Sequence, residues 1–153
     1  MTKKLRRAFP RLFGGEYQMR SRKTRRYNCI AWAAERDDAW WEPSPDGFWP
    51  AGVPDDGTVE AAIRLFESLG FGRTEDAAWQ PGVRKVAIYG DERGYYTHAA
   101  RQLPGGRWTS KLGKGPDIEH DTLDSLTGSS YGTVAQVMQK AQSVPGHEPP
   151  AKP

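Results

Sequence analysis

Residues 84–112 read RKVAIYGDERGYYTHAARQLPGGRWTSKL, and this stretch decides how the chain is expected to fold. Val86 and Ile88 alternate with other side chains, which is the period of a strand with one covered face. The connections GDERG and PGG are short and rich in glycine, so they are suited to reversing the chain. The stretch therefore predicts an antiparallel meander whose strands cover 84–89, 95–103 and 107–112.

Helical patterns lie on both sides of the meander. Asn28 is a good N-cap for a short apolar helix over 28–36, and Thr58 caps a clearer amphipathic helix over 58–70. A last helix is predicted over 131–142, because four apolar side chains share one helical face there: Val134, Val137, Met138 and Ala141. Helices combined with an antiparallel meander indicate the α+β class.

Length and composition set further bounds. The 153 residues fit one domain, and 6 Trp, 6 Tyr and 5 Phe give it a core to bury. No apolar run reaches the length of a membrane span, and the start lacks the pattern of a secretory signal. We therefore expect a cytoplasmic protein without a membrane span, although export by a specialised secretion system would leave no such signal. One Cys and three His exclude an internal disulfide and make a poor zinc inventory, so no metal or other cofactor is expected.

Charge divides the chain unevenly. Residues 1–26 carry ten Lys and Arg and one acid, whereas the rest has a net charge of -6. The organisation expected is a basic arm over 1–26, one domain over 27–142 and a Pro-rich, disordered tail over 143–153. The arm either docks on its own acidic body or contacts a phosphate or membrane surface. It has no zinc-finger, helix-turn-helix or RNA-binding signature, which disfavours nucleic acid as its partner.

Cys29 is the first candidate for chemistry. It follows the capping Asn28 at the first turn of a helix, where unpaired backbone N–H groups favour a thiolate and therefore predict a lowered thiol pKa. The same N–H groups suit the oxyanion of a tetrahedral intermediate. The alternative interpretation is a small buried apolar residue, which is what many free cysteines are.

His98 is the candidate base for this nucleophile. It lies in the middle of a predicted strand, and alternation places it on one face with Tyr96, Ala100 and Gln102. It could instead be a core histidine that bonds a backbone carbonyl. His120 is the first candidate to orient the base and Asp117 the second, because each can accept a hydrogen bond from the ring N–H of His98. His120 could also be a solvated loop residue. The loop 37–57 carries aromatic residues that either line a cleft or cover the core: Trp40, Trp41 and Trp49.

Several strings support a resemblance: YNCIAWA (27–33), KVAIY (85–89), THAARQL (97–103), WTSKLG (108–113), DIEH (117–120) and YG (131–132). Over about residues 9–140 they resemble a family of small bacterial domains, which is similar to the NlpC-type branch of papain-like cysteine peptidases and amidases. The resemblance implies a papain-like α+β fold, in which the helix that carries the Cys packs on a small antiparallel sheet. It implies Cys29 as nucleophile and His98 as base. Asn28, Ser110 and Lys111 would support the site.

Three hypotheses follow for the function. The first is a cysteine hydrolase or acyltransferase that acts on an amide, ester or isopeptide bond of a peptide or acyl substrate. The second is a non-catalytic interaction protein, such as an immunity-like or partner protein, that keeps the fold and binds another protein. The third is a nucleic-acid-associated module that works through residues 1–26.

Overall fold

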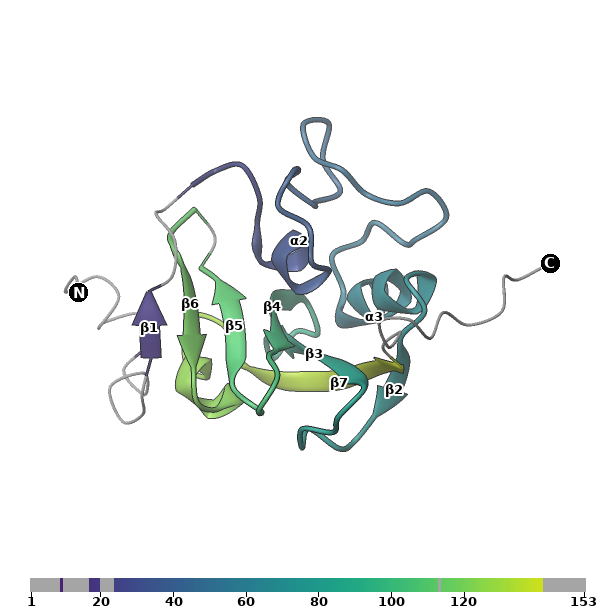
Figure 1. The fold of residues 1–153 in the computed structure, drawn as a ribbon. Coiled ribbons are helices and arrows are strands. Elements are labelled where there is room, and N and C mark those ends of the chain that lie inside the picture. The colour runs from purple at the N-terminus through teal and green to yellow at the C-terminus, as the bar shows by residue number, and fades with distance from the viewer. Residues whose placement is uncertain (1–8, 10–16, 20–23, 113, 142–153) are drawn as a thin grey trace.

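The computed structural model describes residue 9 and residues 17–19, 24–112 and 114–141. Seven strands form one antiparallel sheet in the order β1-β6-β5-β4-β3-β7-β2 (Figure 1). The strands are β1 (Tyr17–Met19), β2 (Gly72–Thr74), β3 (Val83–Gly90), β4 (Tyr96–Gln102), β5 (Trp108–Lys111), β6 (Asp117–His120) and β7 (Thr133–Ala141). The helices are α2 (Cys29–Ala33), α3 (Val59–Ser68) and the 3-10 helix η2 (Leu123–Leu126).

The expectation of a papain-like α+β fold is wrong. The described chain is β-rich, and its two α-helices are short. The central meander is confirmed, because β3, β4 and β5 pair in succession close to the predicted bounds. The sheet extends beyond it in both directions. β6 continues the meander next to β5, and β1 pairs with β6 at that edge.

The predicted helix over 131–142 is also wrong, because this segment forms β7. Val134, Val137 and Met138 have a spacing that fits a helix face, but the β-branched valines also favour a strand. In the structure β7 pairs with β3 on one side and with β2 on the other. Val137 packs into the core on one face of the sheet and Met138 into the core on the other. The burial of these two neighbours on opposite faces breaks the alternation that would have identified a strand.

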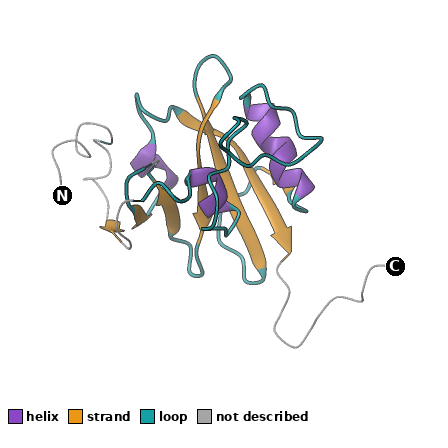
Figure 2. Ribbon diagram, turned by 90° about the horizontal axis from the view of Figure 1, so that it is seen from above, coloured by secondary structure: helices purple, strands orange, loops and turns teal. Residues whose placement is uncertain are grey.

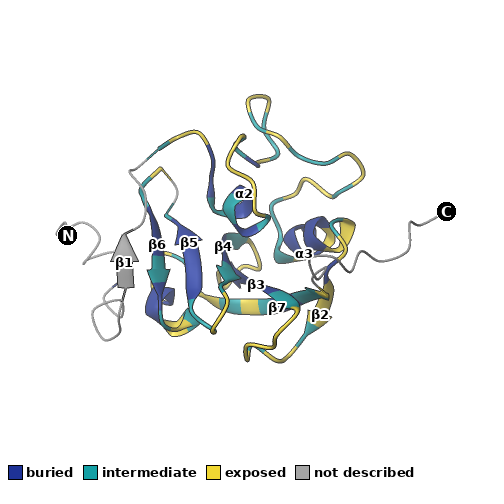
Figure 3. Ribbon diagram, viewed as in Figure 1, coloured by how far each residue is buried: buried dark blue, intermediate teal, exposed yellow. Residues whose placement is uncertain are grey.

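Both α-helices cover the same face of the sheet. α2 lies over β4 and β5, and α3 lies over β3, β7 and β2 (Figures 1 and 2). Ile30, Leu65 and Phe66 pack there with Val86 and other sheet residues in a core that we call the helix-side core. The outer side of α3 is exposed, as Figure 3 shows. The predicted helices over 28–36 and 58–70 are thus confirmed, with shorter bounds.

A second core fills the other face of the sheet and is called the far-side core. It contains Ala87, Tyr89, Trp108 and Ile118 from the strands, and Leu126 from η2. Phe9, which belongs to the predicted basic arm, is buried in it. Of the arm's other side chains, the structure describes those of 24–26. The predicted tail over 143–153 lies outside the described residues. Among the described helices, none has the length and apolar character needed to cross a bilayer.

Candidate functional site

Asn28 fixes the start of α2 and connects it to the Trp-rich loop. Its Oδ1 accepts hydrogen bonds from the N–H of Ala31 (3.2 Å) and of Trp41 (3.1 Å), and its Nδ2 donates to the carbonyl of Trp41 (2.7 Å). The side chain is therefore a helix cap and a backbone clasp. With these bonds made, Asn28 positions Cys29 at the first helical residue.

The thiol of Cys29 lies where the sheet divides. β4 pairs with β5 at Arg101↔Thr109 and Gln102↔Trp108, and the ladder between them does not extend to Ala99. The backbone N–H of Ala99 is therefore available to the Cys29 thiol. We call this unpaired stretch between β4 and β5 the split.

Burial raises the pKa of the Cys29 thiol to about 11, and this effect outweighs the lowering by the backbone N–H groups of Ala99 and Ile30 and by the charge of Lys111. The expectation of a lowered thiol pKa was therefore wrong. The first turn of a five-residue helix donates to the sulfur, but a buried thiolate loses more hydration than these groups restore. At neutral pH Cys29 is a protonated thiol.

Lys111 and Asp117 lie on the helix side of the sheet with Cys29. They are direct cross-strand neighbours on β5 and β6. The Lys111 ammonium donates to the carbonyl of Thr24 (2.8 Å) and lies 5.2 Å from the centre of the Tyr27 ring. Burial lowers the pKa of this ammonium, while the charges of Asp117 and Cys29 raise it. Oδ1 of Asp117 is buried without a hydrogen-bond partner among the described residues.

His98 points into the far-side core. Its ring stacks on Tyr131, with 4.2 Å between centroids and 7° between planes, and meets Tyr89 edge-on at 5.3 Å. The residue is 0% exposed, and neither ring nitrogen has a hydrogen-bond partner in the described part of the chain. Burial lowers the pKa of His98 well below 6.5, and His120 lowers it further. The imidazole is therefore neutral at pH 7.

His120 does not orient His98, because both of its own ring nitrogens are engaged. Nε2 lies 2.9 Å from Oγ of Ser110, and Nδ1 lies 2.8 Å from the carbonyl of Thr122. The carbonyl can only accept, so Nδ1 carries the proton and Nε2 accepts from the Ser110 hydroxyl. Burial lowers the pKa of His120 to about 4. Ser110 and His120 thus form a neutral, buried pair.

The structure sorts the predicted site residues onto two faces of one sheet. Cys29, Lys111 and Asp117 lie on the helix side, whereas His98, Ser110 and His120 lie on the far side. No hydrogen bond joins the Cys29 thiol to His98. The thiol nevertheless lies close to the backbone of β4 beside His98, because His98 directly precedes Ala99, whose N–H acts on the thiol.

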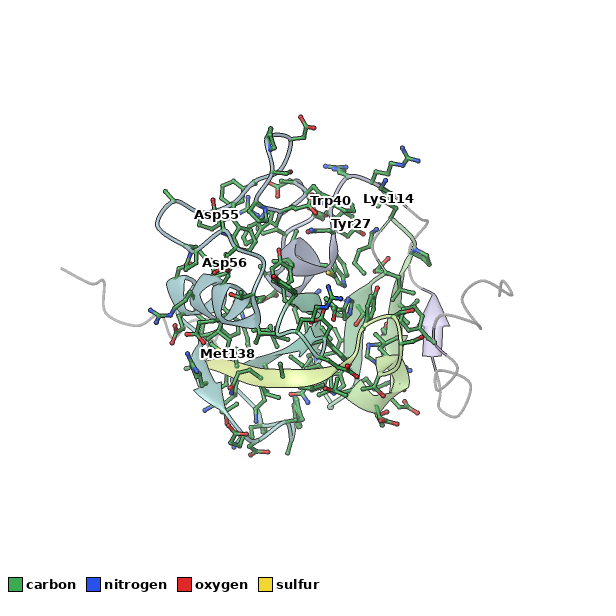
Figure 4. All side chains as sticks on the ribbon, turned by 180° about the vertical axis from the view of Figure 1, so that it is seen from behind. Tyr27, Trp40, Asp55, Asp56, Lys114 and Met138 are labelled. Atoms are coloured by element: carbon green, nitrogen blue, oxygen red, sulfur yellow. The ribbon has the colours of Figure 1, made fainter. Side chains whose placement is uncertain are left out.

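The three predicted tryptophans have different roles. Trp41 is a buried member of the helix-side core, and Trp49 stacks on Tyr96 with 6.1 Å between centroids. Trp40 is half-buried on the α2 side of the molecule, where Tyr27 also lies (Figure 4). A cavity of about 470 Å³ follows the Trp-rich loop, between 51–54 and α3, but neither Cys29 nor His98 lines it.

Two tyrosines near the thiol were missed by the sequence analysis. Burial raises the pKa of Tyr96 to about 12, and the charge of Cys29 adds to this shift. Burial also raises the pKa of Tyr131, again with a contribution from Cys29. Tyr131 belongs to the YG string that the resemblance included, but nothing in the string indicated contact with His98. Among the described residues, no cluster of His, Cys, Asp and Glu is arranged to hold a metal ion.

Comparison with known proteins gives a family match. The family model described as a domain of unknown function (DUF7689) matches residues 18–139. No curated protein and no solved structure matches the chain. The matched range includes Cys29 and both strands that border the split, β4 and β5.

Proposed function

The chain belongs to the DUF7689 family, whose function is unknown, and we propose that it is a cysteine hydrolase or acyltransferase acting on an amide, ester or isopeptide bond. Cys29 is the nucleophile and His98 the base. Of the resemblance to NlpC-type cysteine peptidases, this proposal retains the thiol chemistry and not the fold.

The observation that carries the proposal is the unpartnered imidazole of His98. A buried polar group without a hydrogen bond costs about 1–3 kcal/mol, so native structures keep few of them, and a catalytic role is one reason to keep one. Among the described residues neither ring nitrogen has a partner, and His98 is one residue from the N–H that acts on the only thiol of the chain. Covalent catalysis pairs a nucleophile with a free base. Here the two lie on opposite faces of the sheet and would meet through the split.

The protonation states define the first step. Thiol and imidazole are both neutral at pH 7, so there is no preformed thiolate–imidazolium pair. The imidazole accepts the thiol proton as sulfur attacks the carbonyl carbon. A carbon–sulfur bond forms, the bond to the leaving group breaks, and the imidazolium returns the proton to the leaving group. Water, in hydrolysis, or an amine, in transfer, then releases the acyl group.

Catalysis requires the thiol and the imidazole to meet. Catalytic hydrogen bonds are often loose without substrate and tighten when it binds. The split offers the route, because no backbone ladder joins β4 and β5 beside Ala99. Since the His98 ring is held in its stack on Tyr131, the Cys29 side chain is the one that would turn into the split on substrate binding.

Acylation by p-nitrophenyl acetate tests this function directly. We expect peptide mass spectrometry to find acetyl on Cys29 of the wild type, and none at this position in Cys29→Ser. His98→Gln should slow acetylation at pH 7 by about a hundredfold, as loss of a general base does. His120→Gln, which removes the other buried imidazole, is the matched control and should acetylate within about threefold of the wild type. Equal rates in His98→Gln and the wild type would refute the base assignment.

A non-catalytic interaction protein is the second candidate. It is favoured by the raised pKa of Cys29 and by the missing hydrogen bond to His98. The described surface also exposes three large aromatic side chains, a residue type common at binding interfaces: Phe48, Trp79 and Tyr95. Folded wild-type protein that is not acetylated at Cys29 by the ester would decide for this candidate.

A further inference from the structure

Of the rings that the structure describes around His98, that of Tyr131 is nearer than that of Tyr89. The Tyr131 and His98 rings are nearly parallel, at 7°, and their centroids are 4.2 Å apart. Phe9 also packs on the Tyr131 ring, with 4.8 Å between centroids, and is only 4% exposed. His98 is thus enclosed by aromatic rings, and its two nitrogens have no hydrogen bond to any residue that the structure describes.

The backbone holds Tyr131 in place. Its carbonyl accepts a hydrogen bond from the hydroxyl of Thr97, the residue before His98. The next residue, Gly132, has a φ of 72° and exchanges two backbone hydrogen bonds with Gly128. A Cβ on Gly132 would run into the carbonyl of Gly90 at the end of β3. The position of the ring is therefore set by the turn and not only by the packing around it.

A cavity adjoins this turn. It has a volume of about 290 Å³ and is lined by Gly90, Gly128, Gly132 and their neighbours in the two loops. The residue next to Tyr131 thus forms part of a solvent-accessible hollow, whereas His98 itself is fully buried.

We infer that Tyr131 is a positioning residue for His98: its ring, and not its hydroxyl, fixes the plane of the imidazole and shields it from solvent. The inference rests on the proposed function in one respect only, namely that the imidazole so placed is the base for Cys29. The phenol also lies within electrostatic reach of the thiol, since the charge of Cys29 contributes to the raised pKa of Tyr131. Tyr131 is therefore in ring contact with one of the two groups that have to meet and within electrostatic reach of the other.

Diethyl pyrocarbonate tests the shielding without any enzyme assay. The reagent attacks a neutral imidazole nitrogen. His98 is neutral at pH 7, and neither of its nitrogens is hydrogen-bonded within the described ranges. Only burial protects it. Tyr131→Leu should speed modification of His98 by about tenfold or more, as local opening does. Tyr131→Phe keeps the ring and should leave His98 as protected as in the wild type.

His120 is the internal control, because it is buried on β6 and both its nitrogens are hydrogen-bonded. It should stay unmodified in every variant. If His98 is modified as fast in Tyr131→Phe as in Tyr131→Leu, the role belongs to the hydroxyl and the inference is overturned. Modification of both histidines in Tyr131→Leu and also in the better-filled Tyr131→Met would mean that Tyr131 supports the whole fold, which overturns it as well.

Acetylation of Cys29 by p-nitrophenyl acetate separates this inference from the proposed function. Tyr131→Leu should acetylate about tenfold more slowly than the wild type, with rescue by Tyr131→Phe. A wild-type chain that is not acetylated at all would end the proposed function, while the protection of His98 would still decide the role of Tyr131.

Discussion

Ser110 and His120 form a buried hydroxyl–imidazole pair, with Oγ 2.9 Å from Nε2, on two neighbouring strands of the sheet. The second nitrogen of the ring donates to the carbonyl of Thr122, which precedes η2. The pair therefore ties β5 and β6 to the turn that covers the far-side core. It can do so only while the imidazole is neutral, because a protonated Nε2 could not accept from Ser110.

Acid should destabilise the protein through this pair. The pKa of His120 is about 4 in the folded chain and about 6.5 when unfolded. Between these values the unfolded state binds more protons than the folded state. The contribution of neutral His120 to the free energy of unfolding is therefore fully present above pH 6.5 and is lost as pH falls towards 4. The shift corresponds to about 3 kcal/mol. Urea unfolding at pH 7.0, 5.5 and 4.5 measures it, and His98, with a pKa lowered in the same direction, adds to the slope.

His120→Gln should reduce the pH dependence while lowering stability at pH 7. The glutamine cannot titrate, so the part of the slope that belongs to His120 disappears. An unchanged slope between pH 7.0 and 4.5 would show that the buried pair tolerates protonation.

Asn28→Ala should destabilise the fold by about 3 kcal/mol. The change removes a helix cap, worth about 1 kcal/mol, and leaves the buried N–H and carbonyl of Trp41 without their partners. Asn28→Asp is the matched variant: it can still accept from Ala31 and Trp41 but cannot donate to the Trp41 carbonyl. Urea unfolding should order the stabilities as wild type, Asp, then Ala. Equal losses for Asp and Ala would mean that the donated hydrogen bond alone holds the clasp.

Lys111→Met should make Cys29 less reactive. The ammonium charge lowers the pKa of the thiol, and methionine keeps an apolar stem over Tyr27 without that charge. Iodoacetamide attacks only the thiolate, so wild-type alkylation should rise about tenfold per pH unit through pH 8–10, and the variant should lag behind it at each pH. Lys114→Met, at an exposed position three residues away, is the control and should match the wild type. A plateau of the wild-type rate below pH 9 would contradict the raised pKa.

Gly132→Ala should be far more damaging than Gly94→Ala. Both glycines have positive φ, 72° and 87°, so both substitutions strain the backbone by about 1 kcal/mol. A Cβ on Gly94 meets no atom within 4 Å, whereas on Gly132 it collides with the Gly90 carbonyl. The difference between the melting temperatures of the two variants measures the effect of this collision, because the backbone strain is common to both. Similar melting temperatures would show that the turn after Tyr131 yields easily.

The elements that the sequence predicted correctly are those whose signals are local. Asn28 and Thr58 cap helices, each accepting from the N–H three residues on, and short glycine turns bound the strands of the meander. β6 was missed because Asp117–His120 is too short to show a period. The segment that became β7 was misassigned because its pairing with β3, some fifty residues earlier, outweighs its helical spacing.

The candidate site was harder to predict, since it depends on which way each side chain points. Alternation placed Tyr96 and His98 on one face, but the pairing of β3 and β4 shifts register between Tyr89 and Gly90. Across that shift Tyr96 packs with the helix-side core, and His98 contacts residues of the far-side core. One irregular residue in a strand reverses the faces, and no feature of the sequence marks it.

The place of β7 in the sheet has a consequence for biosynthesis. It is the last described strand in chain order, yet it lies inside the sheet, between β3 and β2. A nascent chain that has not yet emerged past Thr133 therefore holds two strands whose hydrogen-bonding edges have no partner. Until residues 133–141 leave the ribosome, those edges can pair with a neighbouring polypeptide instead, so the interval before the final insertion is when this protein is most exposed to aggregation.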